Sequence, residues 1–214
     1  EIGCDLAQLG LRYLGLDVAR EMLLEFRRKL GPRAACSGLL LADANAPWPV
    51  ASESARVVFL SRAAHLFQRE HLVREVRRVA APQAAWLVLG QSARSPDGLR
   101  ARLRAKMREL LSEHGIEGKS GRRTKELLVA DLGAPAQSVV EREVCSWNSD
   151  CSVSAAIAAW RNKPGLAGHA VAPSLKEGVL ARLGAWAESE YGDPQLVQRS
   201  TERYQVTSIR VSKR

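Results

Sequence analysis

Short apolar runs alternate with amphipathic helical patterns along most of this 214-residue chain. An apolar run of this length fits one buried strand, and an amphipathic segment can cross back over a sheet. The alternation therefore predicts an α/β fold with a parallel sheet and helices on both faces. The predicted strands are 1–3, 11–16, 34–41, 56–60, 84–89, 138–147 and 201–211; the predicted helices are 22–30, 71–80, 97–114, 125–132, 153–160 and 174–190.

A single acidic residue, Asp17, ends the apolar run Leu11–Leu16, and an amphipathic segment begins directly after it. The carboxyl end of a strand in a parallel sheet faces the ligand crevice. A carboxylate there can accept hydrogen bonds from both hydroxyls of a ribose. An acidic residue after a strand is also a common helix N-cap. On these residues alone, both interpretations of Asp17 stay open.

Further motifs follow in a fixed order. They are Glu1-Ile2-Gly3-Cys4, Gly15-Leu16-Asp17 with Met22-Leu23, Leu41-Ala42-Asp43-Ala44, Val57 to His65, Ala84 to Gly90, and a closing Ala185-Trp186-Ala187-Glu188 with Gly192-Asp193. In order and spacing this set resembles class I S-adenosylmethionine-dependent methyltransferases, most closely the small-molecule type. The motifs of that type include E-x-G-x-G-x-G and G-x-D-x-S-x-x-M-L.

The resemblance implies a Rossmann-like, seven-stranded, mostly parallel sheet with a helical lid or insertion in the C-terminal half. It divides the chain into a cofactor-binding half (1–92), a helical lid or insertion (93–134) and the remaining sheet with further helices (135–214). The implied activity is transfer of a methyl group from S-adenosylmethionine to an oxygen, nitrogen or carbon of a small molecule. This in-line displacement depends mainly on alignment and desolvation of the reacting groups.

The resemblance also assigns cofactor contacts to individual residues. Gly3 passes under the cofactor, Glu1 steadies that loop, and Asp17 holds the ribose. The adenine lies against Val18 and Met22, although a methionine in a first helical turn is more often plain core. Asp43 accepts the adenine amino group beside the backbone of Ala44, with a turn-capping aspartate as the alternative. The remaining assigned residues, at the reacting centre and along the cofactor wall, are Ser61 and Arg62.

Two residues are candidates for contact with the methyl acceptor. His65 is the one histidine placed to act as a general base, with a purely turn-ordering histidine as the alternative. Trp147, at a strand end in the C-terminal half, is a candidate for the substrate wall. The helices 97–114 and 153–160 are expected to form the lid.

The glycine loop departs from the family pattern. Glu1 and Gly3 match, but Cys4 is followed by Asp5-Leu6-Ala7-Gln8-Leu9-Gly10, and the second and third glycines have no counterpart. Either the sequence lacks a segment that the gene encodes, or the loop is truly deleted and cofactor binding is degenerate. We favour the first interpretation, because the motifs realign on both sides of the gap.

A formal net charge of +9 raises the question of nucleic acid. Arg100, Arg104 and Arg108 recur at four-residue spacing, so they share one helix face that could follow phosphates. A solvated helix face is the alternative, and no aromatic residues are interleaved with these charges. The hypotheses that remain beside a small-molecule enzyme are an RNA methyltransferase and a non-catalytic methyltransferase-like binding or assembly protein.

The four cysteines lack metal-ligand spacing, and no metal site is predicted. Cys145 and Cys151 could pair in an oxidising compartment, but reduced thiols in a cytoplasmic protein are favoured. No apolar run has the length that a bilayer requires, so no membrane association is expected. The oligomeric state cannot be predicted from these residues.

Overall fold

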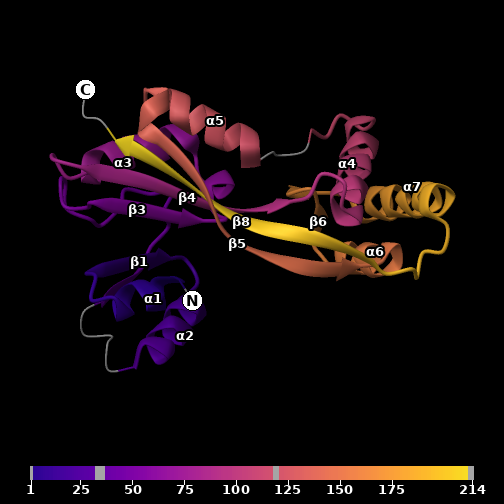
Figure 1. The fold of residues 1–214 in the computed structure, drawn as a ribbon, viewed down its shortest axis with the longest axis horizontal. Coiled ribbons are helices and arrows are strands. Elements are labelled where there is room, and N and C mark those ends of the chain that lie inside the picture. Colours follow the sequence, from indigo (N-terminus) through magenta and orange to yellow (C-terminus); the bar gives the residue numbers. More distant parts are fainter. Residues whose placement is uncertain (1, 32–36, 118–120, 212–214) are drawn as a thin grey trace. The chain divides into compact units, whose positions relative to one another are not determined.

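The computed structural model describes residues 2–31, 37–117 and 121–211 (Figure 1). They fall into two compact units, and each is described by itself. The first comprises Glu1–Val58, Leu66–Trp86 and Arg210–Arg214, and the second comprises Phe59–His65 and Leu87–Ile209. Most predicted elements are confirmed within two or three residues at each end, since apolar periodicity identifies an element better than its boundaries.

The first unit contains a parallel strand pair with helices. Its elements are α1 (Ile2–Gln8), β1 (Tyr13–Asp17), α2 (Arg20–Leu30), β2 (Ser37–Leu41) and α3 (Arg69–Val79). β1 pairs with β2 in parallel, with Tyr13 opposite Ser37 and Asp17 opposite Leu41. The carboxyl ends of both strands therefore lie at the same edge. Gly31, with φ of 57°, ends α2 as its position after the helical pattern predicts.

The strand predicted for residues 1–3 is wrong, because Gly3 lies in helix α1. Cys4 and Ala7, one helical turn apart, are buried together with Leu30 of α2. Helical spacing of small apolar residues thus buries this segment better than an isolated three-residue strand would. Gly10, with φ of 74°, turns the chain out of the helix, and its N–H donates to the carbonyl of Ala7. Glu1 lies outside the described residues.

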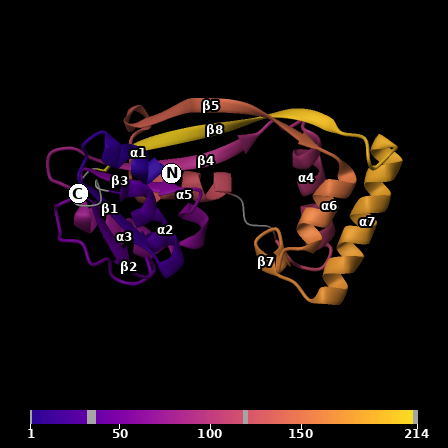
Figure 2. The same cartoon turned by 90° about the horizontal axis from the view of Figure 1, so that it is seen from below.

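A four-stranded sheet has the order β3 (Val57–Ser61), β4 (Ala85–Arg94), β8 (Gln198–Val211), β5 (Val139–Cys151). β5 and β8 are antiparallel and run side by side along their length (Figures 1 and 2). A β-bulge interrupts β5 between Glu143 and Cys145. A third sheet is the short hairpin of β6 (Gly165–Leu166) and β7 (His169–Ala170). The fold is methyltransferase-like α/β, but the described strands form these three sheets rather than one sheet of seven strands.

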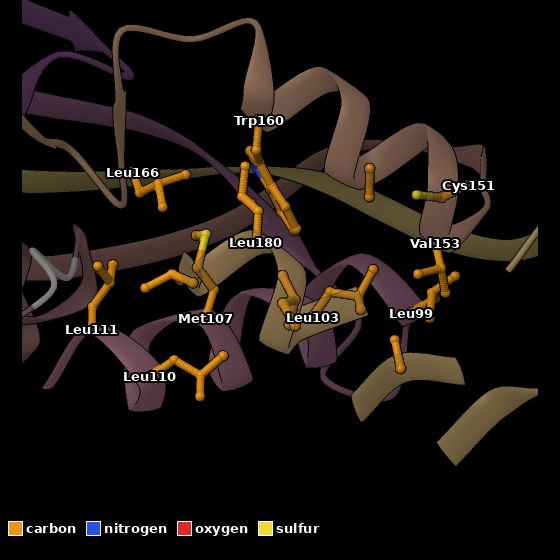
Figure 3. Packing of buried hydrophobic residues seen from close by; sticks show 14 residues of the cluster. Leu99, Leu103, Met107, Leu110, Leu111, Cys151, Val153, Trp160, Leu166 and Leu180 are labelled. Carbon is orange, nitrogen blue, oxygen red and sulfur yellow. The ribbon is translucent and has the colours of Figure 1, made fainter. Parts of the chain in front are cut away.

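Three helices of the second unit enclose its largest apolar core: α4 (Leu99–Ser112), α6 (Val153–Arg161) and α7 (Pro173–Tyr191). Both α4 and α6 contact α7. Leu103 and Leu183 are fully buried there, and Trp160 is nearly so. Figure 3 shows the side chains of this core gathered between the helices. The remaining helices are α5 (Gly121–Asp131) and the 3₁₀ turns η2 (Ala64–Leu66) and η3 (Ala136–Ser138).

The described helices include none with the length and apolarity needed to cross a membrane. Cys145 and Cys151 are both free thiols, as is Cys4, and Cys36 lies outside the described residues. Over the part of the chain that the structure covers, no three histidine, cysteine or acidic side chains gather in a way that could hold a metal ion.

Candidate functional site

Asp17 lies at the carboxyl end of β1, and one of its two carboxylate oxygens is engaged in a hydrogen bond. Oδ1 accepts the backbone N–H of Ala19 at 2.8 Å. The N-cap of α2 is Ala19 and not Asp17, so the simple capping interpretation is wrong in its details. Among the described residues no hydrogen bond engages Oδ2. One carboxylate oxygen is therefore held in place while the other can accept from a ligand.

The next strand places Asp43 beside Asp17. The N–H of Ala42 donates to the carbonyl of Asp17 at 3.0 Å, so the segment that follows β2 is hydrogen-bonded to the end of β1. Asp43 is exposed, and its Oδ1 accepts the N–H of Asn45 at 2.8 Å. The turn-capping role considered for Asp43 is thus present, and it also fixes the carboxylate orientation.

Two large apolar side chains flank this edge and are open to solvent. Val18 is 66% exposed and Met22 is 59% exposed. Met22 is therefore not a core residue of this unit, and the alternative given for it is wrong. Exposed single apolar side chains are common. Val18 and Met22 supply apolar surface, and the carboxylates of Asp17 and Asp43 supply hydrogen-bond acceptors. A nucleoside requires both.

A buried ion pair holds the loop that carries Asp43. Glu75 of α3 is 4% exposed, and its Oε2 accepts both the N–H of Trp48 at 2.8 Å and Nη2 of Arg78 at 2.7 Å. Arg78 donates further to the carbonyls of Val50 at 2.7 Å and Trp48 at 2.9 Å. The hydrogen bond from Arg78 lowers the pKa of Glu75 below its ordinary value, against the smaller opposing effect of burial.

Trp48 in turn fixes Ala44, whose backbone is predicted to contact the adenine. Its indole Nε1 donates to the carbonyl of Ala44 at 2.9 Å. His71 of α3 fixes the loop one residue further on, since its Nε2 lies 2.9 Å from the carbonyl of Ala46. Nδ1 of His71 lies 2.7 Å from Nη2 of Arg74. A guanidinium can only donate, so Nδ1 accepts and Nε2 carries the proton.

None of these loop-anchoring residues, His71 and Glu75 included, is among the site residues predicted from the sequence. A signal was present: His71 and Glu75 share the face of α3 that carries the buried Leu72 and Val79. Polar side chains on an apolar helix face need partners, because burying them unpaired is costly. The sequence does not identify those partners, which come from a loop about 25 residues earlier.

In the second unit, Ser61 at the end of β3 pairs with a tyrosine that the sequence analysis also missed. The Ser61 hydroxyl lies 2.6 Å from the phenolic oxygen of Tyr204 on β8, and either can donate. Tyr204 crosses directly over Gly90 of β4, where a Cβ would overlap the phenolic oxygen. A glycine at this position is therefore required for the tyrosine to reach Ser61.

The residues after Ser61 form a strained turn. Arg62 has φ of 57°, which is uncommon for a non-glycine residue, and its N–H donates to the carbonyl of Gly90 at 2.7 Å. His65 follows in η2 and is exposed, with no hydrogen bond to any described residue. The alternative of a histidine that orders the turn by hydrogen bonding therefore has no support here.

The remaining predicted site residues lie elsewhere. Trp147 is on β5 opposite Glu202 and is 41% exposed. Gly3 serves packing of the first unit, since a Cβ there would lie 2.6 Å from the Phe26 ring and 2.8 Å from that of Tyr13. The Tyr13 and Phe26 rings stack with centroids 5.5 Å apart. Burial raises the pKa of Tyr13, and Cys4 adds to this effect.

Comparison with known proteins identifies the first part of the chain. Residues 2–88 match a family model described as a methyltransferase domain. None of the curated proteins compared with the chain matches it. The fold is similar to that of the YcgJ protein from Bacillus subtilis, with 16% identity over 94% of this chain and 82% of that one and a TM-score of 0.51. A candidate methyltransferase from Bacillus halodurans is 12% identical over 99% of this chain and 88% of that one, with a TM-score of 0.57.

At these identities the structural likeness concerns the fold alone. The family match covers β1, β2 and the acidic residues that follow them. The family match therefore includes the motifs around Asp17, Asp43 and Val57 to His65, whereas the closing motif at 185–193 lies outside it. The match of residues 2–88 to a methyltransferase domain model confirms the resemblance to class I S-adenosylmethionine-dependent methyltransferases for this stretch of the chain.

Proposed function

We propose that the protein binds S-adenosylmethionine at the carboxyl edge of β1 and β2 and transfers its methyl group to a small-molecule nucleophile. The observation that carries the proposal is the arrangement of Asp17 and Asp43 at one edge, beside the exposed Val18 and Met22. It rests further on the methyltransferase domain match of residues 2–88.

The residues of this edge fit a nucleoside in both shape and polarity. Oδ2 of Asp17 would accept from the ribose hydroxyls, while Oδ1 stays bonded to Ala19. Asp43 would accept from the adenine amino group, beside the backbone of Ala44. Val18 and Met22 would cover the faces of the adenine, which buries their exposed apolar surface.

When bound, S-adenosylmethionine supplies an electrophilic methyl group on a sulfonium, which a nucleophile displaces in line. The chain has to align the acceptor and exclude water. Ser61, which the resemblance assigns to the reacting centre, is held by the hydroxyl of Tyr204, and Gly90 leaves the room that this contact needs. His65 is the candidate base for an acceptor that is protonated at the working pH.

Calorimetric titration with S-adenosylmethionine and S-adenosylhomocysteine tests this function. We expect micromolar binding to the wild type and at least about a 100-fold loss in Asp17→Asn, because a charged hydrogen bond to the ribose is lost. Asp5→Asn is the matched control, since it removes an exposed carboxylate of the same unit and should leave the affinity unchanged.

Absence of binding at millimolar cofactor would refute the proposal. It would favour a non-catalytic methyltransferase-like protein, and the shortened glycine motif after Cys4 would then be a true deletion. Binding that survives in Asp17→Asn would instead show that the ribose is held elsewhere.

A further inference from the structure

Four arginines of the second unit influence one another electrostatically, and two of them lie near one carboxylate; we call them the arginine cluster: Arg94, Arg100, Arg104 and Arg108. Arg94 ends β4, and the other three recur every fourth residue along α4. The carboxylate is that of Glu202 on β8, whose side chain is only 8% exposed. Nε of Arg94 lies 3.4 Å from Oε1 of Glu202, and Nη1 of Arg100 lies 4.0 Å from the same oxygen.

The cluster is partly withdrawn from water and incompletely paired. The Nε atoms of Arg94 and Arg104 are buried and have no hydrogen-bond partner among the described residues. Nε of Arg94 thus lies near Glu202, but the direction of its N–H bond does not give a hydrogen bond to that carboxylate. The side chains of Arg94 and Arg100 are still 28% and 35% exposed, so a solute can reach them. Arg104 is therefore not fully solvated, in contrast to the solvated helix face that is the alternative for Arg100, Arg104 and Arg108.

The charges of the cluster are unbalanced. Arg94 and Arg100 lie near Glu202, and the charge of Arg104 is influenced by Arg94, Arg100, Arg108 and Glu202, so four guanidinium groups share one neighbourhood with a single carboxylate. Burial lowers the pKa of Arg104 to about 10, and repulsion from Arg94, Arg108 and Arg100 adds to this. The attraction of Glu202 is the smallest of these effects. Partly buried arginines are usually paired with anionic groups, so this surplus of positive charge suits an anion.

We propose that the arginine cluster binds the phosphate group of a small molecule. Guanidinium groups bind phosphate through paired N–H···O bonds, and a dianion balances the surplus charge better than a single carboxylate would. Direct hydrogen bonds to phosphate oxygens would satisfy the buried Nε–H groups of Arg94 and Arg104.

On β8 the carboxylate of the cluster lies near the hydroxyl pair of Ser61 and Tyr204. Glu202 and Tyr204 are two residues apart, so their side chains share one face of the strand at about 7 Å separation. Tyr204 in turn contacts Ser61. A small molecule held by its phosphate at the arginine cluster would therefore extend along this face of β8 toward the two hydroxyl groups.

The test is calorimetric titration of the full chain with inorganic phosphate and with glycerol 3-phosphate, at constant ionic strength and without S-adenosylmethionine. We expect saturable binding that falls about tenfold or more in Arg104→Met. Arg161→Met is the matched control, because it removes the same charge from an exposed ion pair with Glu177 and should leave the affinity unchanged. Glu202→Gln removes the competing carboxylate and should tighten binding.

Equal losses in Arg104→Met and Arg161→Met would show unspecific attraction to a basic protein and overturn the proposal. Binding of a polyribonucleotide without binding of either phosphate probe would overturn it in favour of RNA. If Arg104→Met does not fold, an unchanged affinity in Glu202→Gln serves the same purpose. Phosphate binding without cofactor binding would refute only the methyltransferase function, and the reverse result would refute only this inference.

Discussion

Replacing Glu75 with glutamine keeps the shape of the side chain and removes its charge. Glu75 is nearly buried, and it accepts from Trp48 and from Arg78, whose side chain is 32% exposed. The amide oxygen of glutamine can still accept one of these bonds. The ion pair with Arg78 becomes a hydrogen bond between a cation and a neutral amide oxygen, and the NH₂ group has to point toward a donor.

The magnitude follows from this contact. A hydrogen bond to a charged group contributes about 1.5–3 kcal/mol, against about 0.5–1.5 kcal/mol for a neutral one. Partial exposure of Arg78 screens its charge, so we expect a loss of about 2 kcal/mol in the free energy of unfolding. For a chain of this size that corresponds to a fall in Tm of roughly 4–8 °C.

Calorimetric melting of Glu75→Gln at neutral pH measures this effect. Glu70→Gln on the same helix is the control: Glu70 is exposed and pairs only with Arg69, so its Tm should change by less than about 1 °C. Equal shifts in the two variants would refute the reasoning. A second readout is weaker S-adenosylmethionine binding in Glu75→Gln, because the loop with Ala44 loses the anchor of Trp48.

The pH dependence has a definite sign. The folded-state pKa of Glu75 is lowered from its ordinary value of 4.5, so its contribution is fully present above that value. It is lost as the pH falls through the lowered pKa, where the folded state must take up a proton. The Tm difference between wild type and Glu75→Gln should therefore shrink below about pH 4.5. A difference that stays constant into the acid range would contradict an ionic role.

Two further substitutions test the second unit. Gly90→Ala should cost about 1–3 kcal/mol, because the new methyl group collides with Tyr204, and much less in a Tyr204→Ala background; urea unfolding of the four variants measures this coupling. Equal costs in both backgrounds would contradict the packing. Leu103→Ala should cost about 3 kcal/mol in the core of α4, α6 and α7, whereas Leu127→Ala, at a 38% exposed position of α5, should cost less than about 1 kcal/mol in the same assay.

Apolar spacing predicted the elements that bury one continuous face. The five apolar residues at helical spacing along α4 are all buried: Leu99, Leu103, Met107, Leu110 and Leu111. The same holds for Leu72, Val73, Val76 and Val79 of α3. Asp17 and Asp43 were predictable for a related reason, because they directly follow recognisable strands of a parallel pair.

The contacts that could not be predicted join residues far apart in the sequence. Tyr204 reaches Ser61 across 143 residues, and only the pairing order of the sheet brings them together. The interpretation of residues 1–3 failed for another reason. Three residues are too few to show a strand period, whereas the spacing of Cys4 and Ala7 fits a helix that packs on Leu30.

The bulge in β5 has a consequence for how copies of this chain behave toward one another. β5 is the edge strand of the four-stranded sheet, and residues 140–148 are exposed on both faces. A long open edge offers unpaired backbone groups to which another chain can add and thereby start aggregation. The bulge after Glu143 breaks the regular hydrogen-bonding ladder, and the charges of Glu141, Arg142 and Glu143 stand directly before it. The strand thus combines two features that discourage edge-to-edge aggregation, in the segment that also presents Val144 and Trp147 to solvent.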